Sequence, residues 1–101
     1  MASRLQLQSE FETILGSMNV YYQPPASIIM KYDAIRYSKK NIHAKFANNS
    51  KYFNKDCYEV TLISRKPDPE AVHKILNLPY CSFDRSYTAD NLNHYVFTLF
   101  Y

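Results

Sequence analysis

The final segment, from Leu92 to Tyr101, constrains the fold of this chain more than any other segment does. An extended backbone points successive side chains to opposite faces, and here both faces carry apolar residues. One face has Tyr95, Phe97, Leu99 and Tyr101, and the other has His94, Val96, Thr98 and Phe100. A strand that is apolar on both faces is typical of an interior position in a sheet or of a subunit contact. The chain is therefore expected to build a β-sheet around its C-terminal segment.

Five further segments are typical of strands. Val20–Tyr22 is a short apolar run that ends at Gln23-Pro24-Pro25, where two prolines remove backbone donors. Alternation predicts strands at 34–38, 41–46 and 58–63, and Asn48-Asn49-Ser50 is typical of a turn, so residues 41–63 are expected to form a hairpin. A final hairpin is expected from 82–88 and 92–101, joined across Ala89-Asp90-Asn91.

Two segments are typical of helices. In Arg4–Leu15, Leu7, Phe11, Ile14 and Leu15 share one face, and Gly16 stands where a C-terminal cap belongs. The second helix is expected to start at Asp68-Pro69-Glu70, with Asp68 as the cap and Pro69 as the first helical residue. Its apolar face is Val72, Ile75 and Leu76, and Pro79 follows its end.

This order of elements predicts an α+β fold. We expect a mainly antiparallel sheet with two helices packed on one face. The length of 101 residues fits one domain, spanning residues 1–101, with one modest core.

Composition narrows the possible functions. The chain has ten Tyr and six Phe, which suit sheet positions and subunit interfaces, but only one glycine. Phosphate-cradling loops and dinucleotide fingerprints need several glycines, so neither is expected. The net charge of +3 is mild for a nucleic-acid binder, although five lysines fall within one segment, namely Lys39, Lys40, Lys45, Lys51 and Lys55. A solvated surface is the simpler interpretation of these lysines.

No catalytic or metal site is expected. His43, His73 and His94 lie on three separate segments, and no closely spaced ligand motif involves Cys57 or Cys81. A nucleophile pair of Cys81 with His94 across the final hairpin would also need an oxyanion hole and an orienting group. Asp84 and Arg85 are sequence neighbours, so on a regular strand they point to opposite faces and are expected to pair with other strands or another subunit.

The chain carries no apolar leader at its start and no apolar run long enough to cross a membrane. Synthesis in a reducing cytoplasm is therefore expected, with both cysteines as free thiols.

Several strings resemble small proteins of the head-to-tail module of long-tailed phages and prophages of Gram-positive bacteria. They are Val20-Tyr21-Tyr22-Gln23-Pro24-Pro25, Met30-Lys31-Tyr32-Asp33-Ala34-Ile35, Tyr58-Glu59-Val60-Thr61-Leu62-Ile63, Lys66-Pro67-Asp68, and the run from Cys81 to His94. The last, which includes Phe83-Asp84-Arg85 and Asp90-Asn91-Leu92-Asn93-His94, is the most specific. The resemblance extends over roughly residues 10 to 101.

The resemblance implies a tail-completion or tail-terminator role. Such proteins form a ring, commonly of six subunits, that caps the tail tube and joins it to the head connector, with DNA only as a passenger in the lumen. The implied partners are the chain itself, the tail-tube protein and the head-connector protein, first in the host cytoplasm and then in the virion neck, with no cofactor and no membrane. Candidate contact residues are Tyr22, Gln23, Pro24, Pro25, Lys45, Asn48, Asn49, Lys51, Asp84 and Arg85.

Three alternatives stay open. The chain could be a stopper or an adaptor at another position in the neck. It could be a small nucleic-acid-binding module that stacks bases on exposed Tyr and Phe beside lysines. The third alternative is an enzyme fragment that uses Cys81 and His94.

Overall fold

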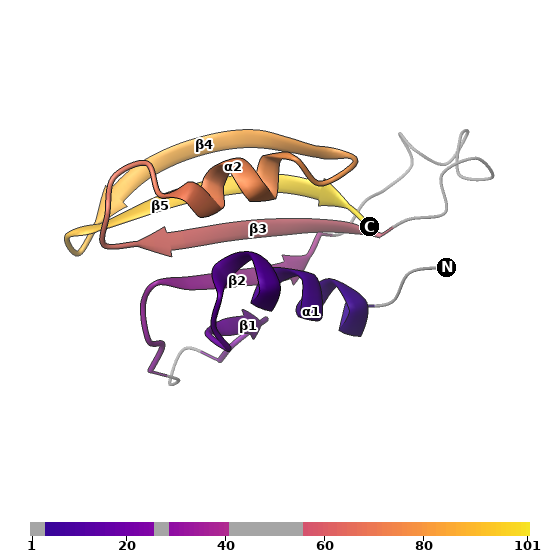
Figure 1. The fold of residues 1–101 in the computed structure, drawn as a ribbon, viewed down its shortest axis with the longest axis horizontal. Coiled ribbons are helices and arrows are strands. Elements are labelled where there is room, and N and C mark those ends of the chain that lie inside the picture. Colours follow the sequence, from indigo (N-terminus) through magenta and orange to yellow (C-terminus); the bar gives the residue numbers. More distant parts are fainter. Residues whose placement is uncertain (1–3, 26–28, 41–55) are drawn as a thin grey trace.

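The computed structural model describes residues 4–25, 29–40 and 56–101. Its elements in chain order are α1 (Arg4–Leu15), β1 (Val20–Tyr22), β2 (Ala34–Lys39), β3 (Cys57–Ser64), α2 (Glu70–Leu76), β4 (Cys81–Ala89) and β5 (Leu92–Phe100). The strands form one sheet in the order β1-β2-β3-β5-β4 (Figure 1). β1 and β2 run parallel, and the other neighbouring pairs are antiparallel. The expected α+β class is confirmed.

β5 lies inside the sheet, between β3 and β4, as its two apolar faces predict. Its centre is buried on both sides, because Val96 is 1% exposed and Phe97 is 0% exposed. Strand propensity and burial therefore agree at this position.

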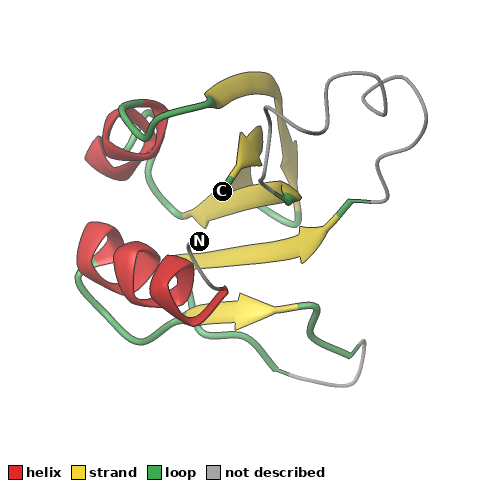
Figure 2. Cartoon of the chain, turned by 90° about the vertical axis from the view of Figure 1, so that its right-hand side faces the viewer, coloured by secondary structure: helices red, strands yellow, loops and turns green. Residues whose placement is uncertain are grey.

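The core lies against the sheet face that the helices cover. Residues that are opposite in register share a face. The register places Ile35 opposite Leu62, and it places Tyr37 and Phe97 on either side of Val60. These side chains form one buried cluster with four helix residues, namely Leu7 and Phe11 of α1 and Val72 and Ile75 of α2. Figure 2 shows α1 and α2 on the same side of the strands.

α1 has the expected bounds. Leu7 and Phe11 are one helical turn apart and both are 0% exposed, so the helix presents a narrow apolar stripe to the core. The Gly16 N–H donates to the Glu12 carbonyl at 2.9 Å, and Gly16 takes a left-handed φ of 77°. Gly16 therefore caps the helix, as predicted from the sequence.

The predicted start of α2 is wrong by one position. Pro69 is the N-cap residue, with an extended backbone, and no side chain caps the helix. Asp68 takes a φ of 47°, its N–H donates to the Tyr95 hydroxyl at 2.7 Å, and its carboxylate lies 3.5 Å from the His73 ring. A capping residue needs extended backbone, and the left-handed φ of Asp68 takes it out of that geometry, so Asp68 lies one residue before the N-cap.

A two-residue turn joins β4 to β5. Ala89 pairs with Leu92, and the residues between them, Asp90 and Asn91, have φ angles of 53° and 64°. Two successive left-handed residues are the mark of a type I′ turn, whose twist matches that of the hairpin strands. The final hairpin is confirmed, with Ala89 inside the strand rather than in the turn.

The predicted strand at 41–46 and the turn at Asn48-Asn49-Ser50 lie outside the described residues. Among the residues described, neither helix has the length and apolar character that a membrane-crossing helix requires.

Leu7 and Leu5 offer a matched test of the core, because they lie on the same helix and are 0% and 67% exposed. We expect Leu7→Ala to lower the free energy of unfolding by about 2–5 kcal/mol, since it leaves a cavity. Leu5→Ala is expected to change it by less than about 0.5 kcal/mol. Urea denaturation followed by circular dichroism measures both, and equal losses would contradict the placement of α1 on the sheet.

Candidate interaction surfaces

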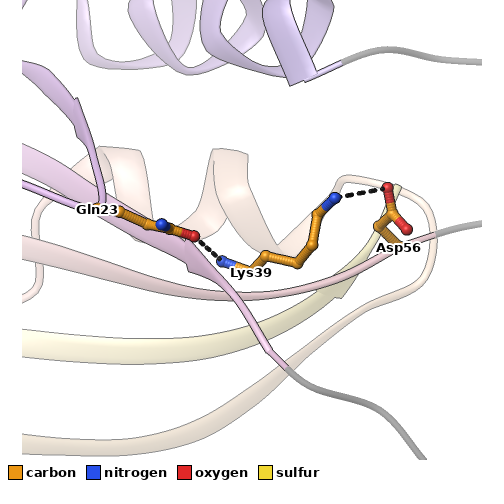
Figure 3. A network of polar contacts seen from close by, with 3 residues as sticks. All are labelled: Gln23, Lys39 and Asp56. Atoms are coloured by element: carbon orange, nitrogen blue, oxygen red, sulfur yellow. Dashed lines mark hydrogen bonds and ion pairs between the residues drawn. The ribbon is translucent and has the colours of Figure 1, made fainter.

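Gln23 ties the end of β1 to the end of β2 (Figure 3). The Lys39 N–H donates to Gln23 Oε1 at 3.2 Å, and the Gln23 N–H donates to the Tyr37 carbonyl at 2.9 Å. The Lys39 ammonium lies 3.3 Å from the Asp56 carboxylate, whose hydrogen bond raises the pKa of Lys39. Gln23 therefore sets the point at which Pro24 and Pro25 leave the sheet.

Pro24 and Gln23 also line a pocket on the sheet face away from the helices. The rest of its lining is polar and comes from β2 and β3, namely Arg36, Ser38, Glu59 and Thr61. Arg36 lies opposite Thr61 and Ser38 lies opposite Glu59, so all four side chains share that face. The pocket carries both charge signs and suits a polar partner surface.

Tyr22 is engaged inside the molecule. Its ring centroid lies 4.9 Å from that of buried Tyr37, and the Arg4 guanidinium carbon lies 4.3 Å from the Tyr22 ring centroid. A guanidinium over an aromatic face is a cation–π contact. Tyr22 is half-buried and contributes to the packing of α1 on β1 as well as to the sheet edge.

Asp84 and Arg85 pair with each other, which corrects the expectation that neighbours on one strand point apart. Arg85 Nη1 donates to Asp84 Oδ2 at 2.9 Å. The register shifts between Phe83, which lies opposite Phe97, and Arg85, which lies opposite Val96. Asp84 is therefore the extra residue of a β-bulge, and a bulge breaks the alternation of side chains that the expectation assumed.

The described candidate residues fall into two groups at opposite edges of the sheet. Tyr22, Gln23 and Pro24 lie at the β1 edge with Pro25 beyond it, and Asp84 and Arg85 lie on β4. Four strand-to-strand steps separate β1 from β4, or roughly 19 Å at the usual strand spacing. The other candidates, Lys45, Asn48, Asn49 and Lys51, lie outside the described residues.

Reasoning from the sequence missed the exposed aromatic rings of β4. Phe83 is 47% exposed with its ring against Phe97, and Tyr87 is 43% exposed and stacks on His94 with ring centroids 4.7 Å apart. The available signal was that every residue of 82–88 other than these two rings is polar or charged, which is typical of an exposed edge strand.

The geometry separates Cys81 from His94. Cys81 lies opposite Leu99 of β5, which is five positions from His94 on that strand, or about 17 Å. Burial raises the pKa of the Cys81 thiol to about 11. Cys57 pairs with Phe100 across the other side of β5, and neither cysteine is in a disulfide. Cys81 and His94 therefore do not form a nucleophile–base pair.

Among the residues in 4–25, 29–40 and 56–101, no three His, Cys, Asp or Glu side chains gather closely enough to hold a metal ion. Comparison of the chain with protein-family models, with curated proteins and with solved structures found no match.

The thiol of Cys81 is expected to react slowly with iodoacetamide. Thiolate is the reactive form, and a rise in pKa from 9.0 to about 11 lowers the thiolate fraction at pH 8 about 100-fold. Alkylation at Cys81, measured by peptide mass spectrometry in a Cys57→Ser variant, should reach the unfolded-chain rate only in denaturant. Equal rates in the folded and unfolded chain would contradict the burial of this thiol.

Proposed function

We propose that this chain is a structural assembly protein of a long-tailed phage that caps the tail tube as a homo-oligomeric ring and joins the tail to the head. The observation that carries the proposal is the presence of two different candidate surfaces at opposite edges of one sheet. A ring requires heterologous contacts, in which each subunit presents two unlike surfaces. A six-membered ring is the form that the resemblance implies.

Two of the five strings that resemble head-to-tail proteins coincide with these edges. The string from Val20 to Pro25 forms β1 and the bends after it, and the string from Cys81 to His94 forms β4, the turn and the start of β5. The residues that carry the resemblance therefore lie both in the core and at the sheet edges, where contacts with other subunits can form.

The polar part of the sheet face away from the helices, around Arg36, suits a channel that DNA crosses. Its described polar residues carry both charge signs, with exposed Arg36 beside half-buried Glu59 and Ser38. A mixed surface of this kind lets DNA slide, because it lacks the basic stripe that holds phosphates tightly.

A stopper or an adaptor in the neck would use the same kind of surfaces, so the tube-capping experiment is the one that separates these functions. The purified chain is mixed with polymerising tail-tube protein, and the length and ends of the tubes are imaged by negative-stain microscopy. We expect tubes that stop growing and carry a ring of density at one end. Bare tubes of unchanged length would contradict the terminator role, and binding to the head connector would then be measured.

Pro24→Arg provides a surface variant for the same assay. Pro24 lines the polar pocket, and a long cation there would obstruct a partner side chain, so we expect the concentration needed for capping to rise about tenfold. Lys74→Ala, at an exposed position of α2, is the control and should cap like the wild type. If Pro24→Arg also caps normally while remaining folded, the pocket is not a ring or tube contact.

A further inference from the structure

β4 is a long edge strand. It has nine residues, of which Ser82 to Thr88 are all exposed, and it pairs only with β5 among the described strands. The Phe100 N–H donates to the Tyr80 carbonyl, so the alternation of an antiparallel ladder turns the backbone groups of Cys81 and Phe83 outward. Counting from the Ala89–Leu92 pair that closes the turn, the backbone groups of Ser86 and Thr88 also face outward.

The opposite edge of the sheet is closed to another strand. β1 has three residues, and its Val20 N–H donates to the Met18 carbonyl at 2.8 Å. The Val20 carbonyl accepts from Gln8 Nε2 of α1 at 3.0 Å, and Pro24 and Pro25 have no N–H to offer. Short strands, prolines and covered backbone groups are the usual means of blocking an edge. Of the two edges of the described sheet, β4 is the one open to strand addition.

The β-bulge determines which strand can pair with β4 so that opposite side chains lie on the same face of the sheet. When a regular strand pairs antiparallel with a second copy of itself, opposite side chains must lie on the same face of the sheet. Because side chains alternate strictly, this requires the two-fold axis to pass through a residue and not between two residues. In β4 the alternation breaks between Asp84 and Arg85, whose side chains contact each other on the face away from the helices. A two-fold axis between these residues therefore brings matching faces together at every pair, which a regular strand cannot do.

The outward backbone groups agree with that axis. It places Phe83 opposite Ser86 of the second copy, and Cys81 opposite Thr88, so outward donors and acceptors meet. Phe83 and Ser86 both belong to the helix side of the sheet, since they lie opposite Phe97 and Tyr95. The bulge adds local twist, and a copy of the same strand has the same twist.

Charge and size are also complementary. The axis places each Asp84 opposite Arg85 of the second copy. The two Asp84 carboxylates and the two Arg85 guanidinium groups then form a square in which the charges alternate in sign. Each large exposed ring then faces a serine, because Phe83 lies opposite Ser86 and Tyr87 lies opposite Ser82. The neighbouring symmetric registers place Asp84 opposite Asp84 or Arg85 opposite Arg85, and like charges directly opposite are destabilising.

We propose that the free chain forms a two-fold dimer in which β4 pairs with β4 of a second copy, with Asp84 opposite Arg85. This contact uses the same patch on both copies, so it is isologous and differs from a ring contact. The inference goes beyond the proposed function. In a phage neck, the dimer would keep the β4 edge covered until the tube or connector displaces it.

Sedimentation velocity over a range of concentrations tests the dimer on the purified chain alone. We expect a concentration-dependent dimer for the wild type. Arg85→Glu places four carboxylates around the axis and should raise the dimer dissociation constant at least about tenfold. Exchange of the charges, with Asp84→Arg and Arg85→Asp together, restores both the internal pair and the alternating square and should return the constant to within about threefold of the wild type.

Circular dichroism and thermal unfolding of each variant show whether it is folded. A wild type that stays monomeric at every concentration would overturn the proposal, as would a folded Arg85→Glu variant that dimerises normally. A charge-exchange variant that is folded but monomeric would also overturn it. The tube-capping assay tests the proposed function independently of the dimer, because a dimer can form whether or not the chain caps a tube.

Discussion

Tyr37 connects the N-terminal half of the chain to the sheet. Its ring is 1% exposed and packs edge-on against Phe11 of α1 at 5.1 Å and Tyr58 of β3 at 5.9 Å between centroids. Its hydroxyl donates to Gln8 Oε1 at 2.6 Å, and burial raises its pKa. Because the hydroxyl has a partner, the large ring can be buried without an unsatisfied polar group. Removing it would loosen α1 and β2 together.

The same interaction makes the two sheet edges unequal. Gln8, which accepts from Tyr37, also donates to the Val20 carbonyl at the outer side of β1. The contact that anchors α1 in the core therefore closes one edge of the sheet. No comparable contact among the described residues covers β4, where a bulge and an ion pair shape the edge instead. An assembly protein gains from this inequality, since one open edge limits the number of ways in which copies associate.

Local periodicity predicted most elements well. The bounds of α1 and β1 were predicted correctly, β2 extends by one residue at its C-terminal end, and β3 extends by one residue at each end. Candidate sites were harder to predict. The proline bend at Gln23 and Pro24 was visible as a backbone signal, and it does border a pocket. The pairing of Asp84 with Arg85 was excluded on strict alternation, because nothing in neighbouring residues signals the bulge.

By itself, the sequence determined the helices, the sheet and the interior C-terminal strand of the described residues, because these depend on residues two to four positions apart. The tertiary structure alone decided the strand order β1-β2-β3-β5-β4, the bulge at Asp84 and the loss of Asp68 as a cap. Each of these depends on partners distant in sequence, such as Val96 for the bulge and Tyr95 for Asp68. Long-range packing energy sets such pairings, and no local pattern encodes it.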